Sequence, residues 1–191
     1  MIREAYEAAA VFFVDTAEQI GPDQWEQPGL GVWTVRDLVG HTSRALLTVE
    51  MYLAEPAAQR EVMQPVDYFP RAQAGRADPA SVAARGRAAG VALGPDPTTA
   101  VRDIAVRVLA QVKSAADEIL VSTPVGGMRL IDYLPSRVFE LAVHTLDLAT
   151  ALPVAVTLPA TVAAVSLHLL AVSKACVPYT PPGCILKACA A

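Results

Sequence analysis

The chain has 191 residues, of which 53% are hydrophobic and only 18% are charged, and its mean hydropathy is +0.38. That length suits one well-filled core, and the composition excludes general disorder, which requires low hydrophobicity and high net charge. The net charge of −4 and the lack of a dense run of lysine or arginine argue against a nucleic-acid partner, which would need many phosphate contacts.

The sequence predicts neither a membrane span nor a signal peptide. The longest uncharged stretch, 148–173, contains two prolines, and its unbroken apolar part, 160–172, is shorter than the ~20 residues of a spanning helix. Acidic residues interrupt the N-terminal segment that a signal peptide would need to be apolar. We therefore expect a cytoplasmic protein. Its three cysteines are expected to remain free thiols in a reducing compartment: Cys176, Cys184 and Cys189.

Helix signals dominate the first third of the chain. Good helix formers run over 3–20, where Gly21 and Pro22 end the helix. A second helix is predicted from Thr34 to residue 56. The Thr34 hydroxyl can cap its first turn, and Asp37, at the third helical position, can complete the capping arrangement.

The rest of the chain continues in helices separated by breaks. Four prolines over 56–79 predict a long loop with room for one short turn, and a loop of that length can cover a site. Two helices are expected after it, a weak one and a strong one, over 81–93 and 98–120. A tight turn or small hairpin is predicted around Gly126 and Gly127. The last two predicted helices run from 132 or 135 to 152 and from 157 to 175.

These elements predict an all-α fold, a four-helix bundle with additional short helices and a C-terminal tail. We place the bundle over 1–152. The segment 153–191 then adds a final helix and an irregular tail, without a full second domain.

Two of the predicted helices carry polar residues on one stripe of an otherwise apolar surface. Four residues, spaced by three, four and three, lie within about 80° of the circumference of the helix that ends at 152. They are Arg137, Glu140, His144 and Asp147. The helix that begins at Thr34 has a similar stripe, composed of Asp37, His41, Arg44 and Thr48.

The stripes have two interpretations. Most polar stripes face water, and a Glu–His pair four residues apart is then a surface pair worth about 0.3 kcal/mol. Alternatively, the stripes face each other across the bundle and bring His41, Glu140 and His144 together. Two imidazoles and one carboxylate suit a divalent transition metal with open coordination positions. Arg137 and Asp147 would then support the ligands or contact a substrate.

Other catalytic motifs do not occur in the sequence. There is no HExxH, zinc-finger spacing, P-loop, strand-to-helix GxGxxG or G-x-S-x-G. The single Glu-x-x-x-His also differs from the paired Glu-x-x-His motifs of di-iron bundles. We interpret His168, the third histidine, as a core or surface residue rather than a catalytic base.

The two stripes lie in sequence segments that resemble a known family. WTVRDLVGH (33–41) and, about a hundred residues later, RVFELAVHTLDLA (137–149) are similar to the N-terminal domain of the mycothiol-dependent maleylpyruvate isomerase family. That family belongs to the DinB-like superfamily of metal-binding four-helix bundles. The resemblance covers roughly residues 3–152.

The resemblance implies that His41, Glu140 and His144 are metal ligands. The metal of the family is most often zinc, although relatives in the superfamily bind nickel or other divalent ions. Family enzymes use a low-molecular-weight thiol, mycothiol in actinobacteria, whose sulfur approaches the metal. A divalent cation favours the thiolate, which is the nucleophile. Its addition to a small electrophilic substrate implies S-transfer or, if the thiol later leaves, cis–trans isomerisation.

Two functions follow as hypotheses: a mycothiol-dependent transferase or isomerase, and a non-catalytic metal- or ligand-binding bundle. The isomerase proper has a second domain that contributes to its active site, whereas 39 residues follow residue 152 here. A cavity above the metal lined by Arg44 and Arg137 would favour an anionic substrate or a thiol, and a fourth protein ligand would favour a structural metal. We expect a small-molecule substrate, no nucleic-acid or membrane partner, and a monomer or homodimer.

Overall fold

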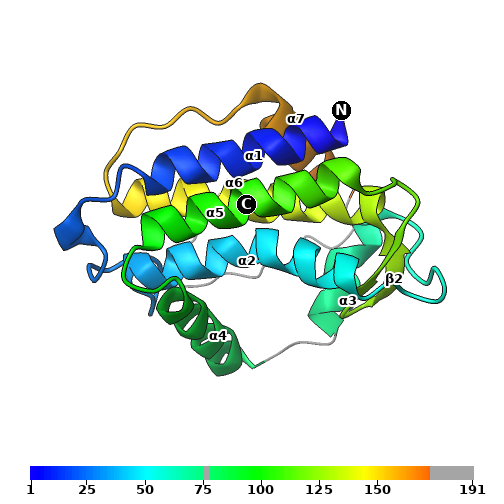
Figure 1. Cartoon of the computed structure of the whole chain (residues 1–191), viewed down its shortest axis with the longest axis horizontal. Helices are drawn as coiled ribbons and strands as arrows, with labels where there is room; N and C mark the ends of the chain where they lie inside the picture. The colour runs from blue at the N-terminus through cyan, green and yellow to red at the C-terminus, as the bar shows by residue number, and fades with distance from the viewer. Residues whose placement is uncertain (75–77, 173–191) are drawn as a thin grey trace.

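The computed structural model describes residues 1–74 and 78–172. Four long helices lie side by side in it (Figure 1): α1 (Ile2–Ala17), α2 (Val35–Ala54), α5 (Pro97–Ser114) and α6 (Leu130–Ala151). Each of α1 and α2 packs against both α5 and α6, so that the four helices form a ring around one core. The predicted all-α bundle is therefore confirmed.

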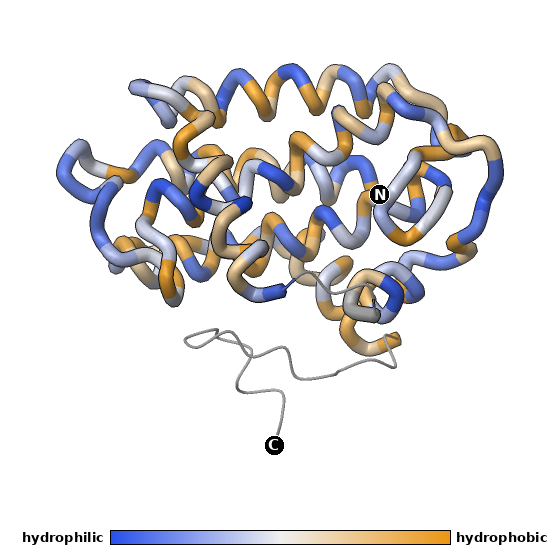
Figure 2. The backbone as a smooth tube through the Cα atoms, turned by 90° about the horizontal axis from the view of Figure 1, so that it is seen from below, coloured by the Kyte–Doolittle hydropathy of each residue, from blue (hydrophilic) through white to orange (hydrophobic). Residues whose placement is uncertain are grey.

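The core is filled by apolar side chains that recur every three or four residues on each helix. Figure 2 shows this pattern as hydrophilic and hydrophobic positions that alternate along the helical turns. Tyr6 and Phe13 of α1, Leu38 and Leu46 of α2 and Leu141 of α6 are fully buried. Burial of each such side chain stabilises the fold by about 1.5–3 kcal/mol, and so decides which face of each helix points inward.

The start of α2 agrees with the sequence prediction. After α1, a short 3₁₀ turn, η1 (Pro22–Gln24), leads the chain toward α2. The Thr34 hydroxyl accepts a hydrogen bond from the backbone N–H of Asp37 at 3.2 Å, and the Asp37 carboxylate accepts one from the backbone N–H of Thr34 at 3.1 Å. This reciprocal cap stabilises the helix start by about 1 kcal/mol. It also sets the rotation of α2 and thus the direction of His41 in the second turn.

The predicted helix over 98–120 is too long. α5 ends at Ser114, and the strand β1 (Leu120–Thr123) pairs with the antiparallel strand β2 (Gly126–Arg129). Val121 and Met128 are partners in this pairing and both are buried, which the helical pattern did not reveal. Gly126 has a φ of +113°, a conformation that a residue with a Cβ rarely adopts. The predicted hairpin is therefore confirmed, and it displaces the end of the preceding helix.

α6 begins at Leu130, directly after β2, rather than at 132 or 135 as predicted. Pro135 lies inside the helix, where it removes one hydrogen-bond donor. The first turn is held by Asp132, whose carboxylate accepts hydrogen bonds from Arg60 and Arg129. An acidic residue at this end also interacts favourably with the helix dipole.

The segment predicted as a long loop has structure of its own. It contains a 3₁₀ turn, η2 (Pro65–Asp67), and a short helix, α3 (Tyr68–Ala74), which packs against α6. Ahead of them the backbone joins the hairpin, because the N–H of Val62 donates to the carbonyl of Gly127 at 3.0 Å. The segment therefore covers part of α6, as a site-covering loop would.

Two further helices flank the bundle. α4 (Pro79–Ala92) crosses α2 at close range, because a side chain at Gly40 would overlap the backbone of Gly90. α7 (Ala160–Val172) packs against α6 and α1. The end of the predicted 157–175 helix and the three cysteines lie outside the described residues. In residues 1–74 and 78–172, no helix is both long and apolar enough to cross a membrane.

Candidate metal centre

His41 on α2 lies beside Glu140 and His144 on α6. Each residue offers one ligand atom, and these three atoms lie within 4.8 Å of one another. Nε2 of His144 is 3.2 Å from Oε2 of Glu140, one helical turn away. The ring centroids of the two histidines are 4.8 Å apart, with the ring planes at 79°. The two polar stripes therefore face each other where α2 packs against α6.

Burial rules out the alternative interpretation that both stripes are solvated surfaces. Asp147 is only 4% exposed and Arg137 only 8%. The side chains of His144 and Glu140 remain 17% and 27% exposed, so solvent and small ligands still reach the cluster. The stripes are thus a polar part of the interior with access from outside.

Two aromatic rings hold the imidazole of His41. Besides the ring of His144, the indole of Trp33 lies with its centroid 4.4 Å from that of His41. Trp33 is fixed in turn, since its Nε1–H donates to the carbonyl of Ala83 on α4 at 3.1 Å and Gly86 leaves room for its ring. α4 therefore supports the candidate ligand from behind, a contribution that no sequence spacing indicated.

Asp147 orients the other histidine. Its Oδ2 lies 3.3 Å from Nδ1 of His144, so that the buried carboxylate accepts the Nδ1–H hydrogen bond. The lone pair of Nε2 then faces Glu140 and the cluster. Carboxylates commonly orient metal-binding histidines in this way. Asp147 thus lies within hydrogen-bond distance of the candidate ligand His144.

The two histidines have opposite pKa shifts. Burial, together with the nearby charges of His144, Arg44 and Arg137, lowers the pKa of His41 to about 3, although Glu140 opposes this shift. Burial also acts to lower the pKa of His144, but hydrogen bonds to Asp147 and Glu140 outweigh it and raise that pKa to about 9. At neutral pH, the His41 imidazole is therefore neutral, whereas His144 carries a proton that a metal ion would have to displace.

The Glu140 carboxylate is ionised throughout the physiological range. Burial acts to raise its pKa, but the hydrogen bond to His144 and the charge of Arg137 dominate and lower the pKa to about 2. One anionic oxygen donor and two imidazole nitrogens thus meet at one point, which is a donor set that zinc and related ions accept.

The residues fit a metal ion in two further respects. Neither ring nitrogen of His41 has a hydrogen-bond partner within the described parts of the chain, and its Nδ1 is fully buried. A buried imidazole without partners is costly unless it binds something. In residues 1–74 and 78–172, no fourth His, Cys, Asp or Glu joins the cluster. Three protein ligands with an open position are typical of catalytic rather than structural zinc sites.

Arg44 and Arg137 flank this cluster, each one turn from a candidate ligand. Arg44 follows His41 on α2 and is half-buried. Arg137 precedes Glu140 on α6, and its guanidinium carbon lies 4.8 Å from the ring centroid of Tyr133 and 5.2 Å from that of Tyr68. The tyrosines were not singled out in the sequence. Tyr133 was detectable, being four residues before Arg137, but Tyr68 lies in the segment that we predicted as a loop.

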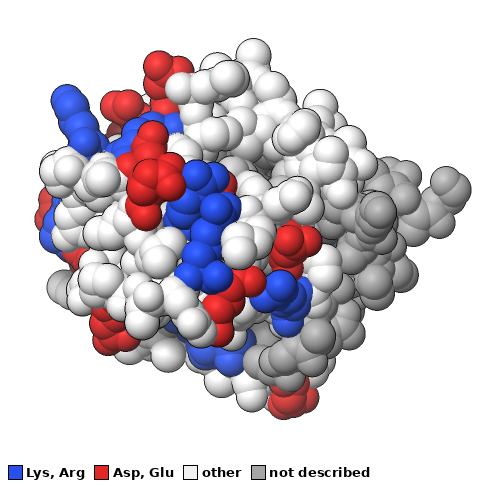
Figure 3. All heavy atoms as spheres, turned by 90° about the vertical axis from the view of Figure 1, so that its right-hand side faces the viewer, with Lys and Arg blue, Asp and Glu red and all other residues white. Residues whose placement is uncertain are grey.

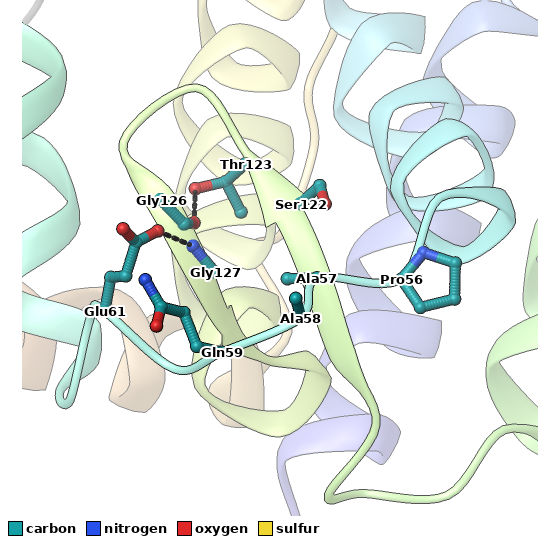
Figure 4. Close-up of a pocket in the computed structure, with 9 residues that line it drawn as sticks. All are labelled: Pro56, Ala57, Ala58, Gln59, Glu61, Ser122, Thr123, Gly126 and Gly127. Atoms are coloured by element: carbon teal, nitrogen blue, oxygen red, sulfur yellow. Dashed lines mark hydrogen bonds between the residues drawn. The ribbon is translucent and has the colours of Figure 1, made fainter.

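Two open, shallow pockets lie elsewhere. One, of about 340 Å³, lies between the 56–61 segment and the hairpin (Figure 4). Its polar groups are engaged locally, because Glu61 accepts a hydrogen bond from the backbone of Gly127 and Thr123 donates one to the carbonyl of Gly126. The other, of about 440 Å³, is mainly apolar and lies between the end of α6 and residues 154–156. Neither includes a residue of the histidine–glutamate cluster, which remains the candidate site.

Comparisons with known proteins support the family suggested by the two sequence segments. The mycothiol maleylpyruvate isomerase N-terminal domain family matches residues 6–149, which include both polar stripes and most of all four bundle helices. The comparisons with curated proteins and with solved structures gave no match. Since the match spans most of the chain, this protein belongs to the mycothiol maleylpyruvate isomerase N-terminal domain family.

Proposed function

We propose that His41, Glu140 and His144 bind a divalent transition metal, with zinc as the first candidate and nickel as the second. We propose further that the protein uses this metal and a low-molecular-weight thiol, mycothiol, as an S-transferase or isomerase on a small electrophilic substrate. The observation that carries the proposal is the three-ligand cluster between α2 and α6, in which no fourth ligand from the described residues takes part. Membership in the family supports the choice of thiol.

The chain's own residues prepare the ligands. Asp147 accepts the Nδ1–H of His144 and keeps Nε2 directed at the cluster. The low pKa of His41 keeps that imidazole unprotonated at neutral pH. When bound, a divalent cation stabilises a thiolate relative to a thiol and so supplies the nucleophile.

The charges around the cluster suit an anionic reactant. Arg44 and Arg137 both lower the pKa of His41 by their positive charge, which places them within electrostatic reach of the cluster. The thiolate adds to a carbon–carbon double bond of the electrophile, and the electron pair of that double bond takes up a proton. If the adduct rotates about the former double bond and then loses the proton and the thiolate, the double bond re-forms and the result is isomerisation. If the carbon–sulfur bond persists, the result is S-transfer.

Metal analysis of purified protein tests the first part of the proposal. We expect about one equivalent of divalent metal in the wild type and its loss in His41→Ala, Glu140→Gln and His144→Ala. His168→Ala is the matched control, because His168 is exposed on α7 and distant in sequence from both stripes. Equal metal content in the wild type and in the three ligand variants would contradict the site.

Consumption of mycothiol with a panel of electrophiles tests the second part. The expected result is turnover that requires both the thiol and the metal and that is lost in His144→Ala. Retention of metal without turnover for any electrophile would favour the second candidate, a non-catalytic metal-binding bundle. The three-ligand cluster alone is compatible with that candidate, and the thiol assay separates the two.

A further inference from the structure

Within the described residues, Arg137 is a buried cation with no carboxylate at ion-pair distance. It is 8% exposed and lies against the rings of Tyr133 and Tyr68, which interact favourably with a guanidinium at these distances. Burial acts to lower its pKa, but the effects of Tyr133, Tyr68, Glu140 and Tyr52 prevail and raise the pKa above its usual range. The side chain is therefore always charged.

Most of the hydrogen-bonding capacity of Arg137 is unused. A guanidinium has five N–H donors. Within the described residues, Arg137 makes one side-chain hydrogen bond, from Nε to the Ser136 hydroxyl at 3.1 Å. The four N–H groups on Nη1 and Nη2 have no acceptor in residues 1–74 and 78–172. Neither of these two nitrogens is among the fully buried unpartnered atoms of the described residues.

Other arginines of the chain differ in this respect. Six of them form ion pairs with carboxylates at 2.6–2.9 Å, and all six are more exposed than Arg137. They are Arg3, Arg36, Arg60, Arg102, Arg107 and Arg129. Among the described residues, these more exposed arginines have carboxylate partners, whereas Arg137, whose charge costs the most to bury, has none.

The charges near Arg137 favour an anion. The two negative charges of Glu140 and Asp147 would balance a divalent cation at the candidate metal site. Without a metal, one of these two charges is balanced by the proton on His144. Arg44 also has no ion-pair partner in the described parts of the chain. The charge of Glu140 acts on Arg137 without forming an ion pair. Neither arginine therefore has a carboxylate at ion-pair distance on the described elements, in a protein whose net charge is −4.

We propose that the Nη edge of Arg137, whose guanidinium lies against Tyr68 and Tyr133, binds a carboxylate group of the small-molecule substrate beside the histidine–glutamate cluster. This inference deepens the proposed function and rests on it for the statement that the bound anion is the substrate. The binding site itself needs neither metal nor thiol.

The surroundings select a carboxylate among anions. The two Nη nitrogens form a planar edge that matches the two oxygens of a carboxylate with parallel hydrogen bonds. The rings that surround the guanidinium offer apolar faces, which suit the carbon skeleton of an organic acid. Arg137 lies three residues before Glu140 on α6, a spacing at which side chains are neighbours. A substrate held at Arg137 thus has its next atoms beside the candidate metal ligands.

Binding of benzoate to the metal-free protein tests the proposal. Benzoate is a planar carboxylate, benzamide is its uncharged counterpart, and inorganic phosphate is an anion of another shape. Titration calorimetry on chelator-treated full-length protein would be done with all three. We expect benzoate to bind more tightly than benzamide or phosphate. We expect its affinity to fall at least about tenfold in Arg137→Lys, which keeps the charge but loses the planar edge, and in Arg137→Met.

Arg85→Met is the matched control, because Arg85 is exposed on α4 and forms no ion pair among the described residues. This variant should bind benzoate like the wild type. The proposal is overturned if benzoate does not bind, if benzamide binds equally well, if phosphate is the preferred anion, or if the Arg137 variants bind benzoate unchanged. Dependence on Arg44→Met instead of on Arg137 would also overturn it.

A measurement on the wild type avoids the risk that an Arg137 variant fails to fold. The Nε–H resonance of Arg137 in the ¹⁵N spectrum should shift on titration with benzoate, whereas that of Arg85 should not. A spectrum in which both stay fixed contradicts the proposal. This assay contains no thiol or metal, so its failure is distinguishable from failure of the proposed function. If benzoate binds but no thiol-dependent turnover is found, only the proposed enzymatic activity is contradicted. If turnover is found but benzoate does not bind, only the carboxylate site at Arg137 is contradicted.

Discussion

Two groups of charged residues in this molecule illustrate different uses of charge. At the hairpin end, Arg60 and Arg129 both bond to Asp132, and Arg129 also bonds to Glu118. Figure 3 shows acidic and basic side chains interleaved on this end of the molecule. Between α2 and α6, by contrast, Arg44 and Arg137 lie beside the histidine–glutamate cluster with no carboxylate bonded to either in the described parts of the chain.

On the proposed function, this difference separates charges that stabilise the fold from charges that bind a ligand. Paired charges at the hairpin end join the 60–62 segment, the strands and the start of α6, so their removal should affect stability. The charges between α2 and α6 are incomplete without a ligand, so their removal should affect binding. The predictions below test this division from the largest expected effect to the smallest.

Asp147→Asn should weaken metal binding by about 10- to 100-fold, the usual effect of removing a carboxylate that orients a ligating histidine. An asparagine can present its N–H₂ to His144 and so favour the wrong tautomer. A chelator-competition titration measures the affinity. Asp132→Asn, a similarly buried carboxylate at the hairpin end, is the control and should leave the affinity unchanged. Equal metal affinity in the wild type and Asp147→Asn would show that Asp147 does not support the metal ligands.

Metal affinity should rise with pH, by about tenfold per pH unit between pH 7 and 8. The reason is that the pKa of His144 is about 9 in the metal-free protein, so a proton must leave before that nitrogen can bind. His41, whose pKa is about 3, contributes nothing in this range. Competition titrations with a chelator calibrated at each pH give the slope. A flat profile would show that His144 is not protonated or not a ligand.

Asp132→Asn should lower the free energy of unfolding by about 1 kcal/mol, since two arginines lose their shared partner at a site that is only 10% exposed. Urea unfolding followed by circular dichroism gives the value. Metal content should not change. If Asp132→Asn lost metal as well as stability, the two groups of charges would be coupled. The division between stabilising and ligand-binding charges would then be wrong.

Glu118→Gln should change the unfolding free energy by less than about 0.5 kcal/mol, because Glu118 is 72% exposed and its pair with Arg129 is screened by solvent. The same urea experiment measures it. An effect as large as that of Asp132→Asn would show that the exposed pairs act as one network with the buried carboxylate.

The sequence predicted much of the candidate site because its residues repeat with the period of a helix. The spacing of Arg137, Glu140, His144 and Asp147 placed them on one stripe, and the resemblance of two segments to a known family linked that stripe to His41. Whether the stripes faced water or each other was not decidable from spacing, since both arrangements have the same period. The burial of Asp147 and Arg137 decided it.

The sequence alone determined the local features of this protein. The spacing of apolar residues determined where the long helices form and which face of each points inward. The reciprocal cap between Thr34 and Asp37 determined the start of α2. Both depend on residues within one or two helical turns of each other. Only the tertiary structure decided the contacts between distant segments. The β1–β2 hairpin cut short a predicted helix, α3 brought Tyr68 to Arg137, and α4 brought Gly86 against Trp33 behind His41. Each depends on burial against a partner tens of residues away, which no local pattern records.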